Sequence, residues 1–349
     1  MTRRERALAV LRDARADVLV AADPGTVAWL TGAEGDLESG PSPFALPPLA
    51  VLDAEGALTL VASEDDAGGA ECAVATYPGF TLEPLDPLGG ARGALAPLVA
   101  GRRLAVEAGS VATGLLDGAA WVDVTGALLR ARAIKDADEI AALRAAVALC
   151  DAGQAALRAA LAPGRSELEL WARVRAAIEA RAGRRVPLLA DLVSGPRTAG
   201  VGGAPGARTV REGELVLCDL VPRLGGVWGD SCATVALGEP SAWAVAAHRR
   251  CVDALEAALE ALRPGVAAGD LDALVRARLD FPHHTGHGIG GSTHEEPRIV
   301  PGSATRLEAG MVVALEPGLY GEHEGVRVEQ VALVTADGCD VLSGHDLAL

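Results

Sequence analysis

The chain has 349 residues, of which 50% are hydrophobic, so it can bury substantial cores and two domains are expected. Its formal net charge of −16 leaves no basic face to neutralise phosphates, which argues against a nucleic-acid partner. The first twenty residues lack the long apolar segment and the cleavage site of a signal peptide. No run approaches ~20 apolar residues without a charge or a turn, so we expect no membrane partner.

Six cysteines lie scattered without CxxC spacing. In a chain of this length, that pattern indicates thiols in a reducing compartment, and we expect a cytoplasmic protein. Cys218 is expected to face away from its neighbour Asp219, because successive strand residues point to opposite faces. Cys232 shares a face with Asp230, and we expect a packed thiol there in preference to a metal ligand.

The first part of the chain alternates helical and extended patterns. Apolar residues at 2–15 have helical spacing, and a short helix candidate is stopped by Gly32. Strand-like apolar runs occupy 17–22, 48–53, 57–62 and 103–107. This alternation predicts a small α/β domain, and it contains no histidine.

After residue 132 the pattern changes to long helices and hairpins. Asp136 is expected to start one helix, Ser166 with Glu169 forms a capping box for the next, and Asp270 is expected to cap a later one. Two sets of helices are each followed by a hairpin, which predicts an antiparallel sheet with helices on its outer face. The expected hairpin strands are 214–222 with 227–237, and 311–320 with 325–335.

Each hairpin carries a pair of acidic residues among apolar neighbours. Asp219 and Asp230 face each other if the first hairpin turns at 224–225, and Glu316 and Glu329 do so across a turn at 322–323. Like charges opposed at roughly 4.5–5.5 Å destabilise a sheet, and burial adds a desolvation cost. Protonation of all four is not expected, so cations between them are favoured. The alternative is that backbone amides or arginines satisfy them.

A histidine-rich and glycine-rich loop, FPHHTGHGIGGSTHEEP at 281–297, holds four of the seven histidines. Alone it is a weak signal, because a solvated turn can have this composition. With the four carboxylates, His287 completes a hard ligand set suited to Mn²⁺, Co²⁺ or Zn²⁺ and too large for one tetrahedral zinc site. Two bridged metals would supply amide or ester hydrolysis. The sequence holds no G-x-S-x-G, P-loop or dinucleotide-binding motif.

Four motifs in order, D-x10-D, HHTGHGIGGSTHEEP, ALEPGLY and GVRVEQ, resemble those of the pita-bread metallopeptidases. This family includes Xaa-Pro dipeptidases (prolidases), Xaa-Pro aminopeptidases and methionine aminopeptidases. DVLVAADPGTVAWLTG resembles more weakly the start of a creatinase-type domain, which favours the proline-specific branch. The resemblance implies an α+β fold, with a creatinase-like α/β domain at 1–132 and a pita-bread catalytic domain at 133–349.

The resemblance also implies a ligand set for two divalent ions, Mn²⁺ first, with Co²⁺ or Zn²⁺ as alternatives. Asp219 corresponds to a terminal ligand of one metal. Asp230 and Glu329 correspond to the residues that bridge both metals. His287 and Glu316 complete the set of the other metal, and Glu316 also matches the family's proton-shuttling glutamate.

Further positions match the family's substrate contacts. His283 and His294 match histidines that hold the scissile carbonyl, and the alternative is that they only support metal ligands. Arg298 matches an arginine that some prolidases use to bind the product-side carboxylate. Arg327 is expected to orient carboxylates.

Two other histidines, His284 and His323, are expected to be surface or loop residues. For Trp29 two interpretations stay open, a core residue or one that reaches a partner's site.

One position departs from the family pattern. The loop SGPRTAGVGGAP places Gly202 where the family pattern SGxNxxxPHG has its histidine. The chain must do without that contact, or take one from Arg197 or from the partner subunit of the homodimer that the resemblance implies.

The implied activity is hydrolysis of Xaa-Pro bonds in short proline-containing peptides, most simply by a dipeptidase. The first alternative is an Xaa-Pro aminopeptidase acting on longer peptides. The others are an enzyme acting on a non-peptide amide or C–N bond, and a binding protein weakened as a catalyst by the missing histidine. Retention of all five candidate ligands favours an enzyme.

Overall fold

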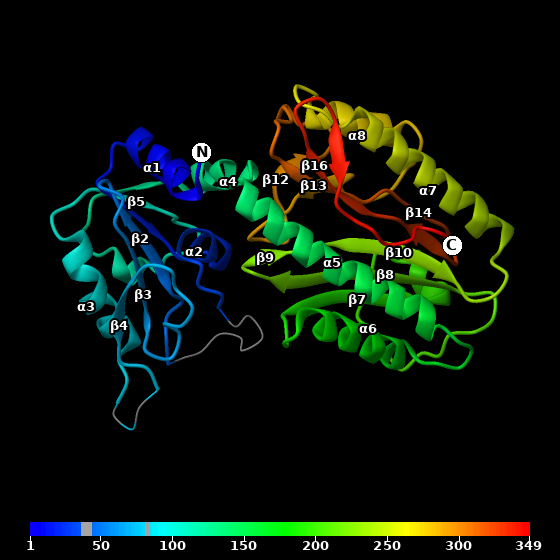
Figure 1. Cartoon of the computed structure of the whole chain (residues 1–349), viewed down its shortest axis with the longest axis horizontal. Helices are drawn as coiled ribbons and strands as arrows, with labels where there is room; N and C mark the ends of the chain where they lie inside the picture. The colour runs from blue at the N-terminus through cyan, green and yellow to red at the C-terminus, as the bar shows by residue number, and fades with distance from the viewer. Residues whose placement is uncertain (36–43, 81, 83) are drawn as a thin grey trace. The chain divides into compact units, whose positions relative to one another are not determined.

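The computed structural model describes residues 1–35, 44–80, 82 and 84–349 (Figure 1). These residues form two compact units, Met1–Arg132 and Ala133–Leu349. Both units combine helices with strands, the first around a mixed sheet and the second around antiparallel sheets. The predicted α+β class is confirmed.

The first unit is built on a six-stranded sheet with helices packed against it. The strand order is β4-β3-β2-β1-β5-β6, in which β1 pairs antiparallel with β2 and parallel with β5. Helix α1 begins at a capping box of Thr2 and Glu5, and α2 ends at Gly32, whose φ of 74° favours glycine. The elements are α1 (Arg3–Asp13), β1 (Val18–Ala21), α2 (Pro24–Thr31), β2 (Leu49–Asp53), β3 (Leu58–Ser63), β4 (Ala73–Tyr77), α3 (Pro87–Val99), β5 (Leu104–Val106), β6 (Trp121–Asp123) and α4 (Thr125–Ala133).

Trp29 belongs to the core of this first unit. Its side chain is buried in the cluster that contains Leu11, Leu19 and Leu128. The guanidinium of Arg6 lies 5.4 Å from the centre of its ring, within the range of a cation–π contact. Of the two interpretations open for Trp29, the structure supports the core residue.

The second unit begins with two helices and the first hairpin. Capping boxes start both helices, Asp136 with Glu139 and Ser166 with Glu169, as the sequence predicts. Helix α5 packs on β8 and α6 packs on β7 (Figure 1). The elements are α5 (Ala137–Ala160), α6 (Glu167–Ala182), β7 (Leu188–Ser194), β8 (Leu215–Leu224), β9 (Val227–Trp228) and β10 (Ser231–Ala236).

The second half of this unit repeats the order of helices and strands. Helix α7 packs against β14 and β15, and α8 packs against β12. The expectation that Asp270 caps α8 is wrong: the N-cap is Ala267, and Asp270 lies in the first turn, where a negative charge also suits the helix dipole. The elements are α7 (Ala242–Ala261), α8 (Ala268–Arg276), β11 (Gly286–Gly288), β12 (Glu295–Ile299), β13 (Val312–Leu315), β14 (Gly318–Tyr320), β15 (Gly325–Arg327), β16 (Gln330–Val334) and β17 (Cys339–Val341).

The strands of the second unit form antiparallel sheets that meet between the two halves. The described residues give the orders β10-β8-β7, β12-β11-β13-β16-β17 and β14-β15, where a single sheet was expected. The backbone N–H of Glu329 donates to the carbonyl of Cys232 at 2.9 Å, which joins the end of one hairpin to the other. This junction brings both acidic pairs into one region.

The first hairpin has a different register from the expected one. Asp219 lies opposite Cys232, not Asp230, because Gly225 and Gly226 together form the turn. Both glycines have positive φ, 63° and 76°, as a two-residue hairpin turn requires. The shift is two residues, so Asp230 stays on the same face and lies diagonal to Asp219.

The second hairpin has the expected register. Leu315 pairs with Gln330 and Gly318 pairs with Arg327, so Glu316 and Glu329 occupy opposed positions between these two ladders.

Among the described helices, α5 is long and apolar enough to cross a membrane by length and composition alone. It carries charged residues, including Asp138, Arg144 and Asp151. Its buried residues pack on β8 and α6. These are the features of a core helix in a folded domain.

Candidate metal centre

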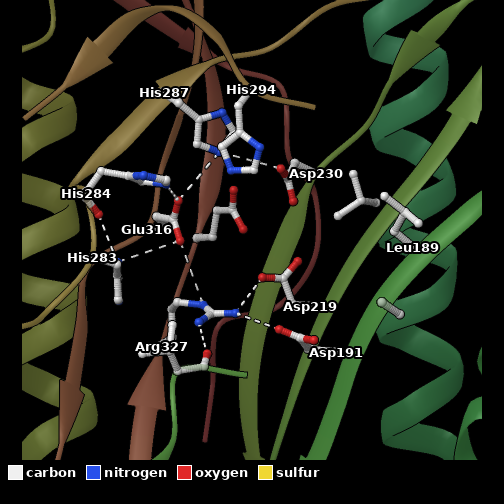
Figure 2. A pocket seen from close by; sticks show the side chains of 14 residues that line it. Leu189, Asp191, Asp219, Asp230, His283, His284, His287, His294, Glu316 and Arg327 are labelled. Carbon is white, nitrogen blue, oxygen red and sulfur yellow. Dashed lines mark hydrogen bonds and ion pairs between the residues drawn. The ribbon is translucent and has the colours of Figure 1, made fainter. Parts of the chain in front are cut away.

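All five predicted metal ligands line one cavity of about 410 Å³ in the second unit (Figure 2). Strands β7 and β8 form one wall, and the histidine-rich loop and the last hairpin form the other. Apolar and ionisable side chains share the lining: Leu189, Ala190, Asp191, Val201, Asp219, Val221, Asp230, His283, His284, His287, His294, Glu316, Arg327 and Glu329.

The five predicted ligands come from five different strands or their ends. His287 Nε2 lies 3.5 Å from Glu316 Oε1 and 3.7 Å from Asp230 Oδ2. Asp230, His287 and Glu329 offer ligand atoms within 4.8 Å of one another, and all three residues are buried. Asp219 is half-buried on β8 and lines the same cavity.

Three of the four carboxylates resist ionisation. Burial raises the pKa of Asp219 to about 6, although the Arg327 guanidinium opposes the shift. Burial and the Asp219 carboxylate raise the pKa of Asp230 well above its ordinary value, and burial and Asp230 do the same for Glu329. A metal-free site would therefore hold protons, and divalent cations would displace them.

The other two predicted ligands, Glu316 and His287, have lowered pKa values and are deprotonated at neutral pH. Burial alone would raise the pKa of Glu316, but the hydrogen bond with His284 and the nearby histidine and arginine charges lower it to about 2. Burial lowers the pKa of His287 to about 4, so its ring is neutral at neutral pH. With Nδ1–H donating to the Gly288 carbonyl at 3.0 Å, Nε2 presents its lone pair towards the carboxylates.

The donor set fits divalent metal ions. Among the described residues, Asp219 Oδ1 and Glu329 Oε1 are buried and have no hydrogen-bond partner. A buried oxygen in this state is costly unless something else satisfies it. Four carboxylates with one neutral imidazole form the oxygen-rich set that Mn²⁺, Co²⁺ or Zn²⁺ accepts. Either metal ions or protons must therefore complete the site.

Arg327 orients one of the carboxylates, as the sequence predicts. Its Nη2 donates to Asp219 Oδ2 at 2.6 Å, and its side chain is only 3% exposed. Its Nε donates to the sulfur of Cys232 at 3.3 Å. Cys232 is buried and is not among the described residues that line the cavity, as expected for a packed thiol.

His283 and His294 line the cavity, as expected for substrate contacts. His283 Nε2 lies 2.9 Å from the Tyr320 hydroxyl. Burial lowers the pKa of both histidines, which favours their neutral forms. His294 is exposed at the mouth of the cavity, and its ring centre is 4.1 Å from that of His287.

His284 lies in a loop, as expected, but it is not a surface residue. This histidine lines the cavity, and its Nε2 lies 2.6 Å from Glu316 Oε1. The backbone between His283 and His287 bends so that His284 also points inward, which no periodicity of the loop predicts. His323 is exposed, as expected.

Arg298 lies opposite His287 in the β11–β12 pair, but it is exposed and is not among the described residues that line the cavity. Arg197 is held by the Glu167 carboxylate and by the carbonyl of Ala204. Neither arginine therefore replaces the missing histidine inside the cavity.

Asp191 is a cavity residue that sequence reasoning missed. It lies on β7 directly opposite Asp219, and its side chain is 38% exposed. The sequence offers one signal for this residue. Asp191 lies in the strand before the loop of Gly202, on the same face as Leu189 and Val193, which are each two residues away. A lone acidic residue in an apolar strand does not by itself show which cavity it faces.

A family model matches the part of the chain that contains this cavity, and curated relatives match over much of the chain. The model of metallopeptidase family M24 matches residues 141–336, more than half of the chain. A probable dipeptidase PepE of Mycobacterium tuberculosis is 38% identical over 223 residues, which are 61% of this chain and 59% of that protein. The match thus spans about three fifths of that relative's length.

Solved structures match over nearly the whole chain. Dipeptidase PepE from Mycobacterium ulcerans is 30% identical with a TM-score of 0.81, and the match covers 99% of this chain and 96% of that one. A prolidase from Thermococcus sibiricus is 25% identical with a TM-score of 0.85, covering 99% and 98%. These matches confirm the predicted fold, an N-terminal domain followed by a pita-bread domain. The chain belongs to metallopeptidase family M24.

Proposed function

We propose that this protein hydrolyses Xaa-Pro peptide bonds with two divalent metal ions and that it acts as a dipeptidase. The observation that supports this most is the convergence of Asp219, Asp230, His287, Glu316 and Glu329 on one cavity, with two buried carboxylate oxygens left without a partner among the described residues. The relatives named dipeptidase and prolidase support the substrate class.

In this proposal, Asp219 would be the terminal ligand of one ion, and Asp230 and Glu329 would hold both. His287 and Glu316 complete the set of the other. When bound, such ions polarise a carbonyl and activate water at neutral pH. Mn²⁺ is the proposed metal, because four of the five ligands are carboxylates, with Co²⁺ and Zn²⁺ as alternatives.

Glu316 takes the proton of the attacking water at its carboxylate and returns it to the leaving amine nitrogen. Its Oε1 is held by His284, so the proton acceptor has a fixed orientation. His283 and His294 donate to the substrate carbonyl oxygen as it gains negative charge. The structure holds both nitrogens of His283, Nδ1 against the His284 carbonyl and Nε2 against the Tyr320 hydroxyl, so its donation to a substrate would require Nε2 to leave Tyr320 and to carry a proton.

A second candidate, an Xaa-Pro aminopeptidase acting on longer peptides, is favoured by one observation. Arg298, the proposed anchor for a product-side carboxylate, is exposed and outside the described cavity lining. A site without that anchor would accept a continuing peptide chain. A binding protein without catalysis is disfavoured, because the five ligands would have no reason to converge.

Hydrolysis assays on matched peptides test the proposal. Xaa-Pro dipeptides, longer Xaa-Pro peptides and non-proline dipeptides would be tested with Mn²⁺ and after chelation. Metal-dependent cleavage of the Xaa-Pro dipeptides above the others is expected, and no turnover on any substrate would refute the peptidase function. Homodimerisation and a cytoplasmic location, also proposed, are tested by sedimentation and by cell fractionation.

A further inference from the structure

We propose that Asp191 selects substrates by binding a primary ammonium group, and that Gly202 makes room for its carboxylate. This inference rests on the peptidase function proposed above. It adds a specificity residue that none of the family motifs in the sequence contains.

The position of Asp191 places its charge beside the reaction site. Asp191 on β7 pairs with Asp219 on β8, and Leu189 pairs with Val221 one step along the same face. All four residues line the cavity. Figure 2 shows the carboxylates of Asp191 and Asp219 side by side, both directed towards Arg327. A substrate group that extends past Asp219 towards β7 therefore meets Asp191.

Gly202 is the reason why the Asp191 carboxylate can lie there. A Cβ atom added at Gly202 would be 1.8 Å from Asp191 Oδ2 and 2.6 Å from its Cγ. No side chain at position 202 is compatible with that carboxylate position. The family pattern that the sequence resembles has a histidine at this point of the loop, whereas this chain has the Asp191 carboxylate beside Gly202.

Arg327 forms a long ion pair with Asp191 but gives its carboxylate no hydrogen bond. Its Nη2 is 2.6 Å from Asp219 but 3.9 Å from Asp191 Oδ2, too far for a hydrogen bond. Its other donors serve the carbonyl of Val201, the Tyr320 hydroxyl and a thiol. No hydrogen bond from the described part of the chain reaches the Asp191 carboxylate, which is open to the cavity.

The surroundings of Asp191 define the chemistry of the group it would bind. Leu189, Val201 and Val221 line the same cavity and supply apolar surface. A positive charge at the end of an alkyl chain matches this combination, because the chain packs on the apolar side chains and the ammonium donates to the carboxylate. Two groups of a peptide substrate have this chemistry, the α-ammonium and a lysine side chain.

The test uses two pairs of substrates that differ by one amine. Lysyl-proline and norleucyl-proline differ at the side chain, and alanyl-proline and propionyl-proline differ at the α-amino group. The ratio of kcat/KM within each pair is measured for the Mn²⁺-loaded wild type and for Asp191→Asn. For one of the two pairs, we expect the ratio of the amine-bearing substrate to its partner to exceed one in the wild type and to fall roughly 10- to 100-fold in Asp191→Asn. The pair that shows this fall identifies whether Asp191 binds the α-ammonium or the lysine side chain.

Two glycine substitutions in the same loop give a matched comparison. Gly202→Ala should displace the Asp191 carboxylate and lower the same ratio. Gly200→Ala should not change it, because a Cβ there would meet its nearest neighbour, the Arg197 carbonyl oxygen, at 3.5 Å. The proposal is overturned if Asp191→Asn leaves the kcat/KM ratio within each pair unchanged, even where it lowers both rates.

The outcome is separate from that of the peptidase assay. If none of the four compounds is hydrolysed by the wild type, the proposed function fails. Calorimetric titration of the same compounds into the Mn²⁺-loaded protein then measures the affinity ratio within each pair. A ratio that Asp191→Asn lowers supports the proposal, and ratios of about one in the wild type overturn it.

Discussion

The Nη2 atom of Arg327 lies 2.6 Å from Oδ2 of Asp219, and this pair joins the last hairpin to strand β8 within the cavity. Arg327 is almost fully buried, and its remaining donors also have partners. A buried guanidinium with this many contacts fixes the orientation of a carboxylate before any metal binds. Arg327 therefore prepares Asp219 for coordination.

Replacement of Arg327 should destabilise the protein strongly. Arg327→Met leaves Asp219 half-buried without its cation, and loss of one partner of such a pair costs about 3–5 kcal/mol. Urea unfolding of the metal-free protein measures this cost. Arg298→Met, at an exposed arginine, is the control and should change the free energy of unfolding by less than about 0.5 kcal/mol. Equal effects of the two substitutions would contradict the role of Arg327.

Asp230→Asn should have opposite effects with and without metal. Burial raises the pKa of Asp230 in the folded protein, so its contribution to stability is present below the unfolded pKa of about 3.9 and is lost as pH rises through the folded pKa. Without metal, the variant should therefore melt higher than the wild type at pH 7, and this gain should vanish near pH 4.

With saturating Mn²⁺ the order should reverse, because the variant has lost a bridging carboxylate and metal binding stabilises only the folded state. Its metal content and its activity should fall together. Melting curves of both proteins, with metal and with chelator, give the comparison. If the variant melts lower than the wild type at pH 7 both with metal and with chelator, burial of the Asp230 carboxylate does not destabilise the metal-free protein.

The only lysine of the chain should also be important for stability. Lys135 Nζ lies 3.1 Å from Glu295 Oε2, and both side chains are almost completely buried, so the pair ties the segment before α5 to the histidine-rich motif. Lys135→Met should cost about 3–5 kcal/mol in urea unfolding. Arg144→Met, which breaks the half-exposed pair with Asp340, should cost about 0–1 kcal/mol. A similar cost for both would mean that the buried pair adds nothing beyond surface charge.

The sequence predicts the hairpins but only one of their registers. Leu315 opposite Gln330 follows from the length of the second hairpin, and Glu316 and Glu329 are opposed as expected. In the first hairpin two adjacent glycines allow more than one turn, and only the twist of the strands selects Gly225-Gly226. A two-residue shift keeps side chains on the same face, which explains why the site is still assembled.

The residues missed from sequence depend on contacts between distant segments. His284 reaches Glu316, which is thirty-two residues away, only because the loop bends at that point. Asp191 faces the cavity only because β7 pairs with β8. Neither contact leaves a periodic pattern in the sequence, whereas the helix caps at Asp136 and Ser166 are local and were predicted correctly.

Arg298 decides between the two proposed peptidases. If it binds the proline carboxylate, as proposed for the dipeptidase, Arg298→Ala should lower kcat/KM for Xaa-Pro by about 2–3 kcal/mol, roughly 30- to 150-fold. A C-terminally amidated Xaa-Pro substrate should lose far less, because it lacks the anion. Equal losses on the acid and the amide would favour the aminopeptidase acting on longer peptides.

The central claim, that five residues hold two metal ions in one cavity, is tested most directly by anomalous diffraction from crystals grown with Mn²⁺. We predict two peaks of manganese density in the cavity, with Asp230 and Glu329 in contact with both. His287 and Glu316 should contact one ion, and Asp219 the other. A single peak, or peaks held by other residues, would contradict the dinuclear centre.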